Sequence, residues 1–235
     1  VQEVAFTLAN AIAVLDAIDQ LSAVDLRRLD VGAGPEPKEL VHARMVTAWL
    51  LRLQPDASEA LQIAGRAHHL ERWKIPRESH PDGREGYLRW RRALQDHHVA
   101  RTLEVLREHG CEDALCQRVE DILRKRNLRR DAETQCFEDA LCLVFLETEF
   151  RELAERLGDE KMTQVLRRTL PKMSDQGKQA ALTIDFDPRD RALLAAVAEA
   201  LLMFRQEGLA QSSLRRRAQD RECGVGARVA EVEEM

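Results

Sequence analysis

Along most of the chain, apolar residues recur with the period of an α-helix, and no useful stretch alternates between apolar and polar residues as a half-buried strand does. Gly110 and Gly158 are placed as helix-ending glycines, and Asp187-Pro188 is a typical helix start. The predicted helices cover Phe6–Ile18, Glu39–Leu53, Asp56–Trp73, Tyr87–His109, Glu112–Lys125, Asp131–Leu157, Glu160–Leu170 and Asp187–Phe204. We therefore expect an all-α fold: a single globular bundle of about eight helices over residues 1–208, followed by a polar tail over residues 209–235.

Composition restricts the class of protein. The 235 residues are 44% hydrophobic and carry a formal charge of −5, so the chain can bury a core but is not a general binder of polyanions. The five cysteines contain no CxxC pair, which favours free thiols in a reducing compartment, either the cytoplasm or an organelle matrix. We expect no membrane span, because no apolar run reaches roughly 18 residues, and no signal peptide, because the first residues lack a basic segment.

Three histidines occupy core-facing positions of successive predicted helices. His42 shares a helical face with apolar neighbours, as do His68 and His97. A buried imidazole needs a polar partner, because its desolvation is otherwise uncompensated. Two interpretations stay open: the rings bind a metal, or they are core histidines bonded to the backbone or to carboxylates.

The dipeptide Glu138-Asp139 lies within an otherwise apolar helix, between Cys136 and Cys142. An ionised carboxylate buried there costs several kcal/mol unless it is paired or ligated. We therefore expect Asp139 to have a cation beside it, either a basic side chain or a metal.

Positive charge is concentrated between residues 66 and 92, where eight basic residues face four acidic ones and three aromatic rings interleave them. Guanidinium groups bind phosphate in planar, bidentate pairs and stack on indole rings. The alternative is that these arginines cap helices and pair with Glu138, Asp139 and Glu147. The side chains expected to bind an anion are Arg66, Arg72, Arg77, Arg84 and Arg91, with Lys125 from a later basic run.

The order of His42, then His68-His69, then Asp139 on a late buried helix resembles the metal-dependent His-Asp (HD) phosphohydrolase superfamily. That resemblance implies an HD-like helical fold in which His42, His68, His69 and Asp139 hold a divalent metal (Mn, Fe or Zn), and the metal activates water for attack on a phosphate ester. The sequence departs from the pattern at its defining pair, because His69 stands where the superfamily has Asp.

Longer motifs resemble a family of unknown function, whose members often carry the name glutamyl-tRNA synthetase without resembling that enzyme. The motifs cover Phe6 to Leu182 and comprise Pro55–Glu59, His69–Arg77, Gly83–Arg91, Glu138–Glu147 and Lys172–Ser174. The resemblance implies membership but no established activity.

The leading hypothesis is a polar pocket in which the basic side chains face Glu138 and Asp139 and bind a phosphorylated small molecule or nucleotide. As an enzyme, the protein would be a phosphohydrolase in which a metal or His69 activates water, while Glu138 and Asp139 complete the catalytic set and Asp139 holds the metal or orients the histidine. Two alternatives stay open. One is an accessory or structural subunit whose C-terminal tail docks on a protein partner, and the other is a module that binds an RNA end.

Overall fold

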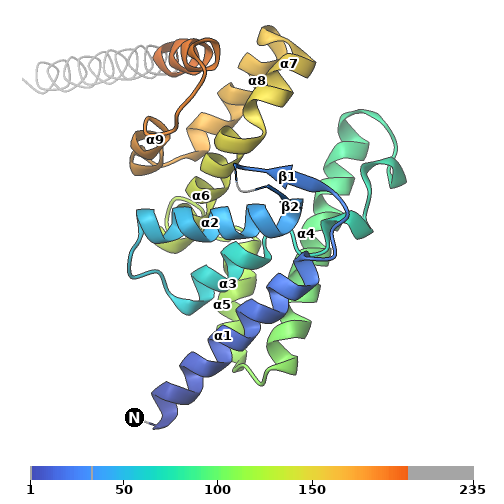
Figure 1. The fold of residues 1–235 in the computed structure, drawn as a ribbon, viewed down its shortest axis with the longest axis vertical. Coiled ribbons are helices and arrows are strands. Elements are labelled where there is room, and N and C mark those ends of the chain that lie inside the picture. Colours follow the sequence, from blue (N-terminus) through green and yellow to red (C-terminus); the bar gives the residue numbers. More distant parts are fainter. Residues whose placement is uncertain (1, 33, 201–235) are drawn as a thin grey trace, which may run out of the picture.

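The computed structural model describes residues 2–32 and 34–200, with side chains described from residue 10 onward. Helices dominate this part of the chain, as Figure 1 shows, so the all-α prediction is confirmed. The helices are α1 (Gln2–Ser22), α2 (Lys38–Leu53), α3 (Glu59–Ala67), α4 (Gly83–Glu108), α5 (Asp113–Leu123), α6 (Ala132–Thr148), α7 (Phe150–Leu157), α8 (Asp159–Thr169) and α9 (Asp175–Ala181). Residues 188–200 are also helical, whereas the predicted tail over 209–235 lies outside the described residues.

Local side-chain chemistry sets several helix ends. The Ser58 hydroxyl accepts a hydrogen bond from the backbone N–H of Leu61, so Ser58 caps α3, which begins at Glu59 and not at Asp56 as predicted. Asp131 caps α6 in the same way through the N–H of Thr134. Gly110 and Gly158 both have positive φ angles, of 68° and 78°, so the two predicted helix-ending glycines are confirmed.

The predicted helix over Asp131–Leu157 is in fact two helices. The chain breaks at Glu149, between the end of α6 at Thr148 and the start of α7 at Phe150. The change of direction allows the Phe150 ring to be fully buried, where it packs edge-on against Phe186. Sequence periodicity missed the break, because both halves are apolar at helical spacing.

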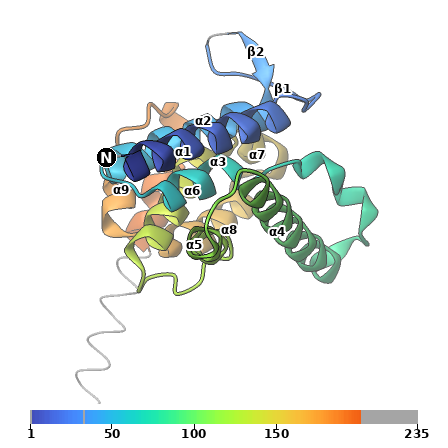
Figure 2. The ribbon, with the colours of Figure 1, turned by 90° about the horizontal axis from the view of Figure 1, so that it is seen from below.

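Helix α2 lies at the centre of the molecule and packs against α3 and α6, while α3 also packs on α5 (Figure 1). The long helix α4 runs along one edge, and the loop over residues 68–82 folds beside its N-terminal end, as both views show (Figure 2). This loop contains two short 3₁₀ turns, Arg72–Lys74 and Arg77–Ser79, and it is fixed to α4 by a 2.9 Å hydrogen bond from the Trp90 indole N–H to the Ile75 carbonyl.

Two small elements were not predicted. Strands β1 (Arg28–Asp30) and β2 (Pro35–Pro37) form a short antiparallel hairpin just before α2. Helix α9 follows a third 3₁₀ turn, Leu170–Lys172, and packs on α6. Both are too short to produce a periodic pattern in the sequence.

The contact between α6 and α9 depends on Asp139. Its carboxylate accepts hydrogen bonds from the Ser174 backbone N–H at 2.8 Å, the Ser174 hydroxyl at 2.5 Å and the Gln135 amide at 3.1 Å. The Ser174 hydroxyl oxygen in turn accepts from the Gly177 N–H and so caps α9. The fit is close, because a Cβ on Gly177 would lie 2.6 Å from Asp139 Cγ. Three donors thus satisfy this buried carboxylate, and the cation that the sequence predicted is not needed.

We expect Asp139→Ala to destabilise the fold by about 2–3 kcal/mol, because it leaves the partly buried donors of Ser174 without their acceptor. Urea denaturation measures the change. Asp139→Asn keeps one side-chain oxygen and should lose less stability. An Asp139→Ala protein as stable as the wild type would contradict this anchoring role.

Candidate functional site

A cavity of about 330 Å³ opens between the central helices and the edge helix α4. Its wall is built from α2, the segment after α3, α4, the loop after α5, and α6, with contributions from α8 and the turn that follows it. Six basic side chains line it against three carboxylates, so the cavity is cationic within a chain of net negative charge. The basic residues are Arg27, Lys38, Arg72, Arg91, Lys125 and Lys172, and the acidic ones are Glu39, Glu138 and Glu149.

The buried carboxylate of Glu39, in the first turn of α2, organises one side of the cavity. The side chain of Arg27 donates to its Oε1 at 2.6 Å, and His69 Nδ1 lies 3.0 Å from its Oε2. The guanidinium of Arg72 adds a weaker charge contact at 3.9 Å. Asp25, itself buried, binds Arg27 and accepts from the backbone N–H of Glu39. These contacts tie the segment before β1, α2 and the segment after α3 together.

The hydrogen bonds of His69 assign its tautomer. Arg72 can only donate, so its Nη1, 3.2 Å away, requires an unprotonated Nε2 on the ring. The proton therefore sits on Nδ1 and is donated to Glu39. Burial, and after it the charge of Arg72, hold the pKa of His69 well below its ordinary value, so the ring is neutral near pH 7.

His42 has the opposite tautomer, and its unprotonated nitrogen faces a carboxylate. The Thr148 hydroxyl donates to the Val144 carbonyl, so Thr148 Oγ1 accepts from His42 Nε2, 3.3 Å away. The lone pair of His42 Nδ1 then lies 3.9 Å from Glu39 Oε2. Two hydrogen-bond acceptors that face each other in a buried site favour a cation between them. A proton on His42 could be that cation, but burial lowers the pKa of His42 and so opposes its protonation.

Glu39, His42 and His69 each place one ligand atom within 4.8 Å of the others. Two imidazoles and a carboxylate form a donor set that suits Zn, Mn or Fe. Neither His68 nor Asp139 belongs to this group, so the geometry does not assemble the predicted ligand set of His42, His68, His69 and Asp139. Asp139 lies elsewhere because its carboxylate holds Ser174.

Two further neutral histidines lie near His69: His68 lines the cavity wall, and His98 lines a smaller neighbouring pocket that shares His68, His69 and Arg91 with the cavity. His68 Nδ1 donates to the Gly65 carbonyl and His98 Nδ1 to the Leu70 carbonyl, which leaves Nε2 of each ring unprotonated. The buried Nε2 of His98 has no hydrogen-bond partner within the described part of the chain. Burial lowers the pKa of His98 to about 4. The His68 and His98 rings both lie close to His69, so uncharged imidazoles stand next to the guanidinium groups of the cavity.

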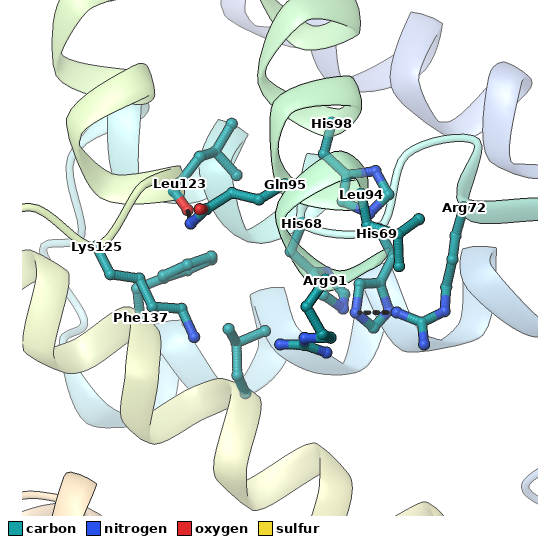
Figure 3. A pocket seen from close by; sticks show the side chains of 11 residues that line it. His68, His69, Arg72, Arg91, Leu94, Gln95, His98, Leu123, Lys125 and Phe137 are labelled. Atoms are coloured by element: carbon teal, nitrogen blue, oxygen red, sulfur yellow. Dashed lines mark hydrogen bonds between the residues drawn. The ribbon is translucent and has the colours of Figure 1, made fainter. Parts of the chain in front are cut away.

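Arg91 and Lys125 reach into the same space from opposite sides, Arg91 from α4 and Lys125 from the loop after α5 (Figure 3). Lys125 pairs with the buried Glu138, while its ammonium lies 5.8 Å from the Phe137 ring centre. The exposed Arg91 has no ion pair among the described residues. Arg72 is held differently, with its guanidinium stacked 5.1 Å from the Trp90 ring centre.

The remaining basic residues predicted for the site lie elsewhere. Arg66 binds Asp19 and Thr47, and Arg77 donates to the carbonyls of His80 and Pro81, so both stabilise the fold. Arg84 is exposed near the start of α4 and does not line the cavity. Neither arginine pairs with Glu138, Asp139 or Glu147, the acids that the structural alternative named; their partners are Asp19, Thr47 and loop carbonyls instead.

Sequence analysis missed the carboxylate at the centre of the site. Glu39 and His42 are three residues apart on α2, a spacing that places two side chains on one helical face. That spacing was an available signal. By contrast, the contributions of Arg27 and Thr148 depend on tertiary contacts that no local pattern records.

Together these features define an all-helical protein with a cationic, histidine-lined cavity. The chain belongs to the family described as Domain of unknown function (DUF4202), whose model matches residues 12–194 and thus includes every residue of the cavity. A search of curated proteins and a search of solved structures found no match. Within the described residues, no helix has the length and apolar character needed to cross a membrane, and the four described cysteines are free.

We expect the buried His98 to make the protein less stable as the pH falls from 6.5 toward 4. Its pKa is about 4 in the folded chain against an ordinary value of 6.5, so in this range the unfolded chain takes up a proton that the folded chain refuses. His98→Gln cannot titrate, and its loss of stability between about pH 7 and pH 5 should be smaller than that of the wild type by about 2 kcal/mol. Urea denaturation at both pH values measures the difference, and equal pH dependence in the two proteins would contradict the assignment.

Proposed function

We propose that the cavity binds a phosphorylated small molecule or nucleotide. The observation that carries this proposal is the Arg91 guanidinium, which lines a cavity with excess positive charge and has no ion pair among the described residues. Two or more basic groups that converge on one space form the usual site for a phosphate dianion, because each N–H to phosphate contact is a charge-assisted hydrogen bond. Lys125, which faces Arg91 across this space, is placed to share the charge.

We further propose that the protein is a phosphohydrolase in which His69 is the general base. Glu39 orients the ring by accepting from its Nδ1, and Nε2 is the basic nitrogen. For Nε2 to accept a proton, Arg72 must leave it, and a bound phosphate would draw the guanidinium away. Nε2 then takes a proton from water as the water oxygen bonds to phosphorus, the ester oxygen leaves with the electron pair of the broken bond, and the proton passes to that oxygen.

A divalent metal is the alternative to His69 as the base, and Glu39, His42 and His69 are the residues that would hold it. When bound, a metal of this kind polarises a phosphate oxygen and lowers the pKa of bound water. Binding through His69 Nδ1 requires that nitrogen to lose its proton, and a neutral ring would then carry the proton on Nε2. Arg72 can no longer donate to Nε2 in that state, so Arg72 and a metal compete for His69.

The test of the phosphate site compares Arg91→Gln with Arg84→Gln. Arg91→Gln should weaken the binding of phosphorylated ligands by roughly tenfold to a hundredfold, because it removes a charged donor. Arg84→Gln changes an arginine on the same helix outside the cavity and should leave affinity unchanged. Calorimetry with a panel of nucleoside monophosphates and sugar phosphates measures both, and equal affinities for the two variants would refute the site.

Hydrolysis is measured on the same panel by release of inorganic phosphate. His69→Gln should reduce the rate by about a hundredfold or more while ligand affinity changes much less, as expected for a general base. Tight binding without any phosphate release by the wild type would remove the enzymatic part of the proposal and retain the binding part.

In the metal-dependent alternative, the protein binds one Zn²⁺ or Mn²⁺ per chain, and we expect Arg72→Gln to bind that metal more tightly than the wild type because the competing guanidinium is gone. Glu39→Gln and His42→Phe should each lose at least about tenfold in metal affinity, since each removes a ligand. Arg84→Gln again serves as the control. Metal titration followed by elemental analysis gives the stoichiometry, and an Arg72→Gln protein that binds no metal would exclude this ligand set.

A further inference from the structure

The only tyrosine of the chain, Tyr87, forms part of the cavity wall on its solvent side. Its ring packs against Trp90 with centroids 5.8 Å apart and planes tilted by 48°. The residue is nevertheless 46% exposed, so part of the ring is open beside the cavity. An accessible aromatic surface at the edge of a cationic cavity is suited to contact a flat, apolar part of a ligand.

Helix geometry places this ring one turn from the phosphate-binding arginine. Tyr87 and Arg91 are four residues apart on α4, which is about 6 Å along the helix axis and on the same face. Both residues line the cavity. A phosphate held by Arg91 would therefore leave its organic substituent beside Tyr87.

The wall behind Tyr87 is rigid. Trp90 is buried, and its indole N–H is bonded to the Ile75 carbonyl. Tyr87 packs on this fixed Trp90 ring and so loses little conformational freedom when a ligand stacks on it. The stacking contact therefore contributes to affinity with little ordering cost.

We infer that the ligand is a free nucleotide, whose base stacks on Tyr87 while its phosphate binds Arg91 and Lys125. This inference rests on the proposed function and adds the class of ligand to it. The cavity volume of about 330 Å³ suits a single small ligand rather than a polymer. Every nucleobase has an aromatic face, so the stacking distinguishes nucleotides from sugar phosphates without choosing one base.

The experiment measures calorimetric affinities for AMP, ribose 5-phosphate and inorganic phosphate, with ³¹P NMR to verify that each ligand stays intact. In the wild type, AMP should bind about tenfold more tightly than ribose 5-phosphate, the gain expected from one stacked base. Tyr87→Ala should remove this gain and leave the affinity for ribose 5-phosphate within about twofold, whereas Tyr87→Phe should retain it because the ring is kept. Leu88→Ala, at an exposed neighbour outside the cavity, is the matched control.

The outcomes separate this inference from the phosphate site. Equal wild-type affinities for AMP and ribose 5-phosphate would overturn the nucleotide assignment while the phosphate site stands. A failure of all three ligands to bind would refute the proposed function itself. A 5′-phosphorylated trinucleotide that binds more tightly than AMP would also overturn the assignment, because an RNA end would then be the better ligand.

Discussion

The buried carboxylate of Glu39 is the interaction on which the cavity depends. An isolated carboxylate in that position would cost several kcal/mol, and Arg27 and His69 offset the cost by bonding to both of its oxygens. Because these partners come from the segment before the hairpin and from the segment after α3, the same contacts that satisfy the charge also fix the shape of the cavity. Glu39 also sets the tautomer of His69, and so the stability of the fold and the chemistry of the site share one group.

Glu138 and Asp139 are neighbours on one helix but have different roles. Successive side chains on a helix point about 100° apart, so Glu138 faces the cavity and pairs with Lys125, while Asp139 faces α9 and binds Ser174. Burial of both was predictable from their apolar surroundings. Lys125 was expected to face Glu138, whereas Ser174, the partner of Asp139, was not predicted because it is distant in the sequence and is brought there only by folding.

The cavity combines cations with neutral imidazoles, and the proposed phosphate site rests on this combination. Histidines that stayed protonated would add more charge but could not accept a proton. Burial and neighbouring arginines hold the pKa of His69 low, so its Nε2 stays unprotonated and accepts a hydrogen bond from Arg72, one of the guanidinium groups that attract an anion. A phosphate and a metal would both act on Arg72, the first by attracting it and the second by replacing its contact with His69.

The sequence by itself determined the helical class and most helix positions, because periodicity and capping are local properties of the chain. It also indicated His42, His69, Arg72, Arg91 and Lys125, since unusual residue types in an apolar or aromatic context are visible without a fold; the structure gathers them around one cavity. Only the tertiary structure decided that Glu39, and not Asp139, is the carboxylate beside His42 and His69. It also decided that Arg66 and Arg77 bond to other parts of the chain and do not line the cavity. The physical reason is that the role of a charged group depends on the partner it binds. Each of these partners is brought into contact by folding and cannot be read from the helical pattern of the sequence.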